Sequence, residues 1–274
     1  MTSASPSDVG SAVSLWRYPV KSMMGEEVTA AEVSERGLVG DRAYALVDRE
    51  TGKVASAKNP RKWPSLFEFR ASYAESPEPG SLVPALVGFP DGRVLSTAGE
   101  GLDRALSDEL GREVVLASSA PEAAVLEEYW PDIEGLALRE TTTDETMPPG
   151  CFFDLALVHV LTTATLDRLG ELYPEGRFEA RRFRPNILVR PTGGETGFVE
   201  NDWIGRTLEV GHEVRLSVTG PCPRCVMTTL AQGDLPKDSG ILRAAAKNND
   251  ANVGIYASVI QGGTIRRGDV VRLV

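Results

Sequence analysis

Apolar and polar residues alternate along much of this chain, and the pattern predicts many short β-strands. The clearest case is residues 208–218, where apolar residues alternate with polar ones on both sides of Gly211-His212. A period of two places one face of a strand in the core, so this segment predicts a hairpin with one buried face. Shorter stretches of the same kind predict strands at residues 12–16, 27–33, 42–47, 114–116, 187–189 and 265–274.

Apolar residues at helical spacing are rarer. Leucines four residues apart predict a short helix over residues 102–110, which Gly111 ends. A second leucine-rich face over residues 166–172 predicts a helix that the hydroxyl of Thr162 or Thr163 would cap. Many strands, frequent Gly and Pro turns and few helices predict a mainly β protein with some helix (α+β), built as a barrel or a sandwich.

Residues 118–150 combine several prolines with many acidic residues, which is typical of a junction between two domains. A chain of 274 residues is long enough for two modest domains. Residues 1–11 are small and polar, which favours a disordered tail. We therefore expect this tail to precede one domain at residues 12–125 and another at residues 126–274.

Composition and charge narrow the range of functions. The formal net charge is −10, so the chain repels nucleic acid and anionic lipid, and neither is expected as a partner. No apolar stretch is long enough to span a membrane, and the N-terminus lacks the pattern of a secretory signal. Three cysteines without such a signal predict a protein of the reducing cytoplasm.

The stretch Gly220-Pro221-Cys222-Pro223-Arg224-Cys225 follows a predicted strand and contains two prolines that stiffen it. The thiolate is the form of cysteine that acts as a nucleophile and binds soft metals, and the neighbouring Arg224 favours this charged form. Three other interpretations stay open. A structural zinc site would need two more ligands, and a redox pair would normally open a helix, whereas residues 227–230 do not look helical. In the third interpretation, Cys222 and Cys225 are ordinary cysteines of the core.

A dense cluster of arginines lies shortly before the strand predicted at residues 187–189, at Arg177, Arg181, Arg182 and Arg184. Guanidinium groups bind phosphate through paired hydrogen bonds and keep their charge when partly buried. The cluster therefore fits either a solvated charged surface or an anion pocket. Lys21-Ser22 and Arg42 follow predicted turns, and they would add cationic contacts to the same anion.

Four motifs in this order resemble the MOSC superfamily. Tyr18-Pro19-Val20-Lys21-Ser22 and Gly37-Leu38-Val39-Gly40-Asp41-Arg42 resemble the N-terminal β-barrel domain that precedes MOSC domains. Arg182-Phe183-Arg184-Pro185-Asn186 and Pro223-Arg224-Cys225-Val226-Met227-Thr228-Thr229 resemble the MOSC domain itself. The resemblance runs from about residue 12 to the C-terminus, and the architecture is similar to that of the amidoxime-reducing component and its bacterial relatives.

The resemblance implies an N-terminal β-barrel-like domain packed on a MOSC β-barrel domain. It implies a molybdenum cofactor (Mo-molybdopterin) between them, and no pyridoxal phosphate. Cys225 stands in the family's Arg-Cys position and would be the catalytic residue and the thiolate ligand of the metal. The positions that hold the pterin and its phosphate correspond here to Lys21, Ser22, Arg42, Arg184 and Asn186, and more loosely to Thr162 and Thr163.

The implied activity is an oxidoreductase that uses two electrons to reduce small N-hydroxylated or N-oxide compounds and releases the oxygen as water. The chain ends at Val274 and has too few cysteines for an iron–sulfur cluster. Electrons are therefore expected from a separate protein of ferredoxin or flavoprotein type. Two alternatives are a sulfur transferase that carries a persulfide on Cys225 and a carrier of the molybdenum cofactor.

Four other residues near these motifs fit more than one role or a purely structural one. Cys222 fits a bystander, a sulfur relay or a redox partner of Cys225. Cys151 is expected in the core. Asp202 and Trp203 fit either an ordinary turn and core position or the edge of the substrate opening.

Overall fold

The computed structural model describes residues 7–274. Strands make up 37% of the chain and helices 17%, which confirms the prediction of a mainly β protein with some helix. The expected tail at residues 1–11 lies partly outside the described residues. Within them, residues 7–11 form the start of strand β1 (Ser7–Arg17), because their backbone groups pair with a strand at the other end of the chain.

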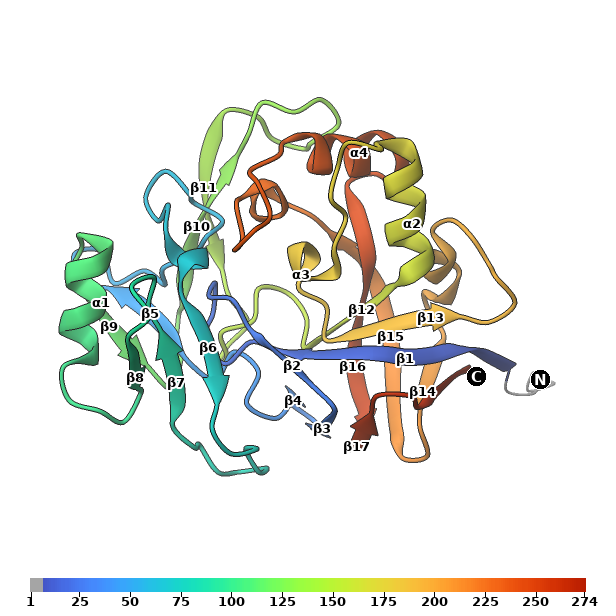
Figure 1. Ribbon diagram of the computed structural model, residues 1–274, viewed down its shortest axis with the longest axis horizontal. Coiled ribbons are helices and arrows are strands. Elements are labelled where there is room, and N and C mark those ends of the chain that lie inside the picture. Colours follow the sequence, from blue (N-terminus) through green and yellow to red (C-terminus); the bar gives the residue numbers. More distant parts are fainter. Residues whose placement is uncertain (1–6) are drawn as a thin grey trace.

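Seven strands close into a barrel, on the right of Figure 1. All neighbours are antiparallel except β12 and β13, and pairing between β13 and β1 closes the circle. The short strand β2 (Glu26–Val28) adds to the edge of β1. The order around the barrel is β13 (Ile187–Pro191), β12 (Val158–Thr162), β16 (Asn252–Gln261), β15 (Val214–Pro223), β14 (Thr207–Val210), β18 (Val270–Leu273) and β1.

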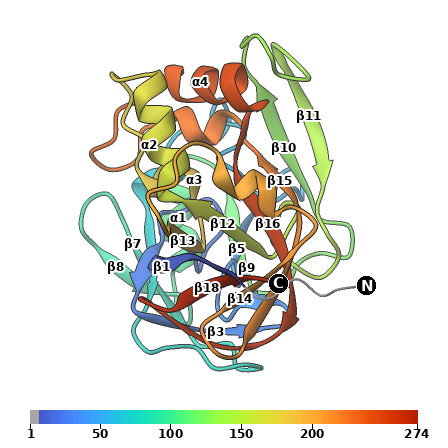
Figure 2. The same cartoon turned by 90° about the vertical axis from the view of Figure 1, so that its right-hand side faces the viewer.

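Three helices lie together at one end of this barrel, where Figures 1 and 2 both show α2 beside α4. They are α2 (Thr163–Leu172), α3 (Ala180–Phe183) and α4 (Gly240–Asn249). Their apolar faces share one buried cluster that includes Leu169 and Ile241. Among residues 7–274, no helix has both the length and the apolar character that crossing a bilayer requires.

The other half of the molecule is built from smaller sheets and one helix, α1 (Leu102–Leu110). One sheet joins β5 (Ala45–Asp48) to β9 (Val114–Ala117), and β10 (Val125–Trp130) pairs with β11 (Thr141–Thr146). A three-stranded sheet of β6 (Arg70–Tyr73), β7 (Ala85–Gly88) and β8 (Val94–Ser96) completes this half. A further three-stranded sheet, formed by β17 (Gly263–Arg266), β3 (Ala30–Ser34) and β4 (Gly37–Leu38), packs instead against the barrel, since Val33, Leu38 and Ile265 are buried in the barrel core.

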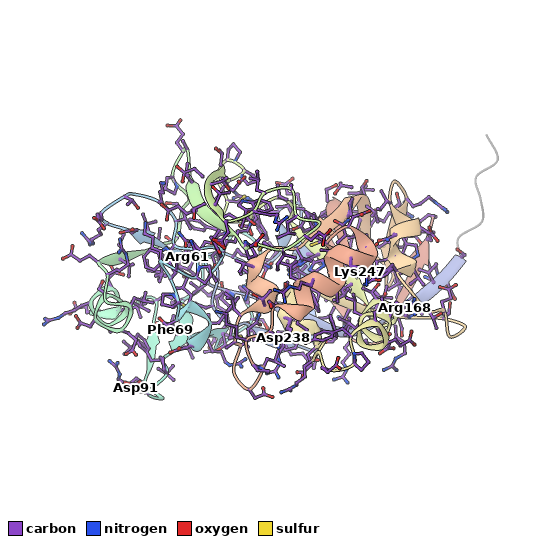
Figure 3. All side chains as sticks on the ribbon, turned by 90° about the horizontal axis from the view of Figure 1, so that it is seen from above. Arg61, Phe69, Asp91, Arg168, Asp238 and Lys247 are labelled. Atoms are coloured by element: carbon purple, nitrogen blue, oxygen red, sulfur yellow. The ribbon has the colours of Figure 1, made fainter. Side chains whose placement is uncertain are left out.

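Three short 3-10 helices complete the described secondary structure: η1 (Leu66–Glu68), η2 (Val199–Trp203) and η3 (Val226–Thr229). Seen from above, Arg61, Phe69 and Asp91 lie in the half that contains α1, whereas Arg168 and Lys247 lie over the barrel (Figure 3). The first half has its own core around Phe69, and the barrel has another around Leu216.

Two segments pass from one core to the other. Strand β1 packs Leu15 inside the barrel, and Val20 and Met23 then enter the core of the first half. Strand β15 likewise ends at the barrel wall, and Val226 and Met227 enter that same core. Lys21 and Cys225 sit at these crossing points, so the fold itself places them where the two halves meet.

Periodicity predicted the regular elements well. Strands β1, β9 and β13 and the hairpin β14–β15 confirm the predictions for those segments. Gly111 ends α1 with a left-handed backbone, and the Thr162 hydroxyl caps α2 by accepting a hydrogen bond from the Thr165 amide at 3.2 Å. The strand predicted at residues 27–33 is split between β2 and β3, and the one at 42–47 begins only at Ala45.

Other segments differ from expectation. Residues 118–150 contain the hairpin β10–β11, whose strands pair with each other although the sequence is acidic and rich in proline. Residues 227–230, expected to be non-helical, lie largely within η3. The strand predicted at residues 265–274 is divided into β17, which pairs with β3, and β18, which pairs with β1 and β14. The domain boundary between residues 125 and 126 stays a prediction.

Candidate functional site

A cavity of about 410 Å³ lies between the two halves of the molecule. Its walls come from both crossing points, from the hairpin β10–β11, from the loop before β12 and from the segment between α3 and β13. Five cationic side chains line it, namely Lys21, Arg42, Lys58, Arg184 and Arg224. Four carboxylates line it as well, namely Glu128, Glu145, Asp154 and Asp250.

Most of the site residues predicted from the sequence line this one cavity, although they come from four separate stretches of the chain. They are Lys21, Arg42, Arg184, Asn186 and Cys225. Ser22, Thr162 and Thr163 are not part of its wall. Cys225 is also the one cysteine of the three that lines it.

The cavity wall contains an unusual concentration of left-handed backbone. Among the described residues, six that are not glycine have a positive φ, and four of them line the cavity. This conformation costs a residue with a Cβ about 1–3 kcal/mol and tends to persist where a functional geometry requires it. The four lining residues are Arg42, Arg184, Asp250 and Ala251.

The cations on one wall are neutralised by carboxylates. The Lys21 ammonium contacts Asp154 and donates to the Phe152 carbonyl at 2.8 Å. Lys58 lies 3.5 Å from Asp154 and 3.0 Å from Glu128. Burial would raise the pKa of Asp154, but Lys21 and then Lys58 hold it well below its usual range. These charges therefore balance within the protein.

Arg42 and Arg184 lie on the ring of Tyr18, at 4.6 and 4.1 Å from its centroid. Asp41 pairs with Arg42. Arg184 is 6% exposed and donates one hydrogen bond, to the Met23 carbonyl at 2.6 Å, and no carboxylate within residues 7–274 pairs with it. Burial, followed by the charge of Arg42, lowers the pKa of Arg184 to about 10. Its remaining donors are available to an anion in the cavity.

Asn186 is buried, and its side chain is committed to the protein. Its amide donates to Asp41 at 2.9 Å and to the Trp16 carbonyl at 3.3 Å, and its oxygen accepts from the His159 backbone at 3.0 Å. Asn186 thus positions Asp41, which in turn neutralises Arg42. Asn186 therefore has a structural role in the cavity wall, because both hydrogens of its side-chain amide are already donated to protein oxygens.

The two cysteines of the predicted loop lie in different surroundings. Burial, followed by the nearby Glu128 charge, raises the pKa of Cys225 to about 12, so this thiol is neutral near neutral pH. The sequence suggested that Arg224 would favour a thiolate next to it. The Arg224 guanidinium instead donates to Cys222 Sγ at 2.7 Å. Cys222 is fully buried and does not line the cavity.

Several predicted residues have roles in the fold. The Thr162 hydroxyl accepts a hydrogen bond from the first turn of α2 and donates one to the buried Glu200 at 2.6 Å. It thereby caps the helix and pairs a buried carboxyl group at the same time. Thr163 begins α2 beside it. The expectation that these threonines line the cofactor therefore does not hold for this cavity. Ser22 is buried and accepts from the Ala57 amide at 3.1 Å, which fixes the turn behind Lys21.

Asp202, Trp203 and Cys151 lie outside this cavity. Trp203 is buried in the barrel core, and neither it nor Asp202 lines the cavity. Cys151 was expected in the core but is only half-buried. It lines a second cavity of about 540 Å³ that shares Arg42, Phe152 and Phe153 with the first.

Sequence reasoning missed Lys58, Glu128, Asp154 and Tyr256 at the cavity. Each is a single residue outside any recognisable motif, and its partners are far away in the chain. Asp154 follows the phenylalanine pair of the loop before β12, and its charge in an otherwise apolar stretch was the one local signal available.

The residues present fit a phosphorylated, metal-bearing ligand. Arg184 supplies an uncompensated buried cation, and Cys225 supplies one thiol facing the same space. Among residues 7–274, no group of three or more His, Cys, Asp or Glu side chains could hold a metal alone. A metal bound here would therefore arrive with ligands of its own, to which Cys225 would add one.

A closed β-barrel joined to a second β-rich half, with a cationic, thiol-lined cavity between them, defines the class of protein. The model of the MOSC N-terminal β-barrel domain matches residues 9–99, and that of the MOSC domain matches residues 152–272. The chain belongs to the MOSC superfamily.

Particular relatives have more specific names. Mitochondrial amidoxime reducing component 2 of Rattus norvegicus is 24% identical, and that of Homo sapiens is 25% identical. Both alignments cover 96% of this chain and 83% of the relative. The YUAD protein of Bacillus subtilis, a solved structure, is 11% identical with a TM-score of 0.49, over 98% of this chain and 97% of that one.

Proposed function

We propose that this protein is a molybdenum-cofactor-dependent oxidoreductase that reduces small N-hydroxylated or N-oxide compounds. The observation that supports this most is that Cys225 and Arg184 line one cavity between the two halves. A soft thiol and an unpaired guanidinium are the groups that a metal and a phosphate would respectively require. The names of the mitochondrial relatives favour the reductive chemistry.

In this proposal Arg184 binds the phosphate, since its charge lacks a partner in the protein. Arg42 lies on the same Tyr18 ring and adds a second guanidinium. Lys21 closes the same wall, although Asp154 already neutralises most of its charge. Cys225 would give up its thiol proton on binding and would be the protein ligand of the metal.

When bound, the molybdenum cofactor supplies the two-electron chemistry that removes oxygen from the substrate, which no side chain provides. The protein orients both reactants and limits the access of water. Leu155, which is 65% exposed, lies at the cavity together with Trp130 and Leu136, and these apolar groups would receive the body of the substrate. Electrons would come from a separate ferredoxin- or flavoprotein-type partner, because the three cysteines within residues 7–274 are not gathered into one metal-binding group.

The test is turnover of an N-hydroxylated compound with an artificial electron donor, normalised to bound molybdenum. Cys225→Ser replaces the soft ligand by a hydroxyl that stays protonated, so reduction should fall to background even where pterin stays bound. Cys151→Ser removes a thiol outside this cavity and is the matched control, with unchanged turnover expected. A fully active Cys225→Ser protein would refute the ligand assignment. Persulfide on Cys225 with neither metal nor pterin would favour sulfur transfer.

A further inference from the structure

Arg224 is a second cation at the cavity that lacks a carboxylate partner within residues 7–274. One of its terminal nitrogens donates to Cys222 Sγ at 2.7 Å, and the other donates to the Phe183 carbonyl at 2.8 Å. Its backbone amide donates to the Ala251 carbonyl at 2.8 Å. The Arg224 side chain is half-buried, and Cys222 is the acidic side chain that accepts a hydrogen bond from its guanidinium.

These contacts tie together three parts of the cavity wall. The loop that carries Cys225 is joined to the segment that ends in Arg184, because Phe183 immediately precedes Arg184. The same arginine also reaches the left-handed pair formed by Asp250 and Ala251. A shift of Arg224 would therefore move the thiol of Cys225 and the guanidinium of Arg184 relative to each other.

The surroundings of the Cys222 sulfur favour its charged form. Burial raises the pKa of the Cys222 thiol, but Arg224 and then His159 lower it, to about 6. Tyr256 is a further neighbour that lowers the pKa of this thiol. Burial and then Cys222 raise the pKa of Tyr256 well above its usual value, so Tyr256 stays neutral. Arg224, His159 and Tyr256 are the titratable or charged groups that face Cys222.

We propose that Cys222 is a positioning residue, whose buried thiolate holds the Arg224 guanidinium and thereby fixes the Cys225 loop against the Arg184 segment. Its role differs from those of a sulfur relay and of a redox partner, because the sulfur faces the protein interior and not the cavity. The consequence for cofactor binding rests on the proposed function. The charge of Cys222 does not, and it can be measured without any cofactor.

The first experiment uses apoprotein from a host that makes no molybdenum cofactor. Thiolate absorbance in the far ultraviolet is recorded from about pH 4 to about pH 10, and the Cys222→Ser signal is subtracted. We expect a midpoint near 6, against about 8.5 for an ordinary cysteine. Arg224→Gln should raise this midpoint by about one to three units. Arg215→Gln, at an exposed arginine on β15 that pairs with Glu209, is the control and should leave it unchanged.

A midpoint of about 8.5 or higher in the wild-type chain would overturn the proposal. So would an unchanged midpoint in folded Arg224→Gln. Should Arg224→Gln or Cys222→Ser fail to fold, wild-type protein labelled with ¹³C at cysteine Cβ gives the same midpoint by nuclear magnetic resonance. Cys151→Ser and Cys225→Ser then identify the remaining signal as that of Cys222.

The second experiment compares cofactor retention in protein from a host that makes the cofactor. Cys222→Ala should retain about tenfold less than wild type, because the loop loses its anchor. Cys222→Ser keeps an acceptor and should retain a substantial part, and Cys222→Asp should restore retention by supplying a carboxylate. Wild-type retention in Cys222→Ala would overturn the positioning role while leaving the proposed function intact. If wild-type protein binds no cofactor, the proposed function fails, and the apoprotein titration still decides the charge of Cys222.

Discussion

Arg177 and Arg184 belong to the same short cluster of arginines, yet they lie in opposite electrostatic environments. Arg177 is 44% exposed and pairs with Glu179 and, at 2.8 Å, with Asp234. Arg184 is buried at the cavity without a carboxylate partner among the described residues. The difference shows that a cation is available to a ligand where the protein leaves its charge uncompensated. A dense run of arginines in the sequence does not by itself mark such a place.

Arg182, between them, shows a third arrangement. It is fully buried and directs its donors at backbone carbonyls, among them Pro236 at 2.9 Å and Leu230 at 3.2 Å. This guanidinium joins the segment after Cys225 to α3. The cluster therefore combines a surface ion network, a structural anchor and a buried guanidinium without a carboxylate partner among residues 7–274, all within eight residues.

The largest expected effect is that of removing the uncompensated cation. Arg184→Ala should reduce molybdenum and pterin content ten- to hundredfold under limiting cofactor, since a charge-assisted hydrogen bond is worth about 1.5–3 kcal/mol. Arg177→Ala, from the same cluster, should keep wild-type content. Equal retention in both variants, measured by metal and pterin analysis of purified protein, would remove Arg184 from the site.

A conservative substitution separates charge from shape. Arg184→Lys keeps the positive charge but loses the planar fork and the contact with the Tyr18 ring at 4.1 Å. We expect cofactor retention to fall by about threefold, between the values for wild type and Arg184→Ala. Retention equal to wild type would show that a point charge is sufficient at this position.

The wall formed by Lys21, Lys58 and Asp154, whose charges compensate one another, is tested through protein stability and not through cofactor retention. Asp154→Asn removes the carboxylate shared by Lys21 and Lys58, and stability at pH 7 should fall by about 1 kcal/mol. The pKa of Asp154 is lowered in the folded protein, so its contribution is present above the unfolded pKa near 3.9 and is lost as pH falls below it. Urea unfolding should therefore show the gap between wild type and variant shrinking below about pH 4.

The matched control for that test is Asp144→Asn, which breaks an ion pair of Lys53 on a residue that is 57% exposed. Its effect should stay below about 0.5 kcal/mol. If the difference in unfolding free energy between wild type and Asp154→Asn does not change with pH, the Asp154 charge contributes nothing to stability.

The smallest effect is expected at the outer end of the cluster. Arg177→Ala should change the free energy of unfolding by no more than about 0.5 kcal/mol, because exposed ion pairs are screened by water and salt. The change should also vanish at high salt. Destabilisation of more than about 2 kcal/mol in urea unfolding would place Arg177 in the structural frame together with Arg182.

Much of the barrel could be predicted from the sequence, because alternation in segments such as 208–218 reflects one buried face directly. The segments α4 and β16 have no comparably simple pattern. Three of the five buried residues of α4 are alanines, which give a weak apolar signal, and the buried residues 253–255 of β16 are consecutive and not alternating. The hairpin β10–β11 was not predicted, because its segment is rich in acidic residues and proline. Its strands are stabilised by pairing with each other, which local propensity does not reveal.

Prediction of the site from the sequence was limited in the same way, because contacts between distant residues have no local signal. Motifs were sufficient to bring Lys21, Arg42, Arg184 and Cys225 to one cavity, because each lies in a recognisable string. They could not reveal which of these charges would be neutralised, since Asp154 approaches Lys21 from 133 residues away. They also misplaced the partner of Arg224, as a guanidinium beside Cys225 in sequence turns towards Cys222 in the fold.

The most direct test of the account is the metal and pterin content of freshly purified wild-type protein from a host that makes the cofactor. If the cavity holds the cofactor through Arg184 and Cys225, molybdenum and pterin should both be present in amounts equal to that of the chain. Protein that repeatedly contains neither, while Cys225 carries a persulfide, would contradict the account and identify sulfur transfer as the better explanation of this site.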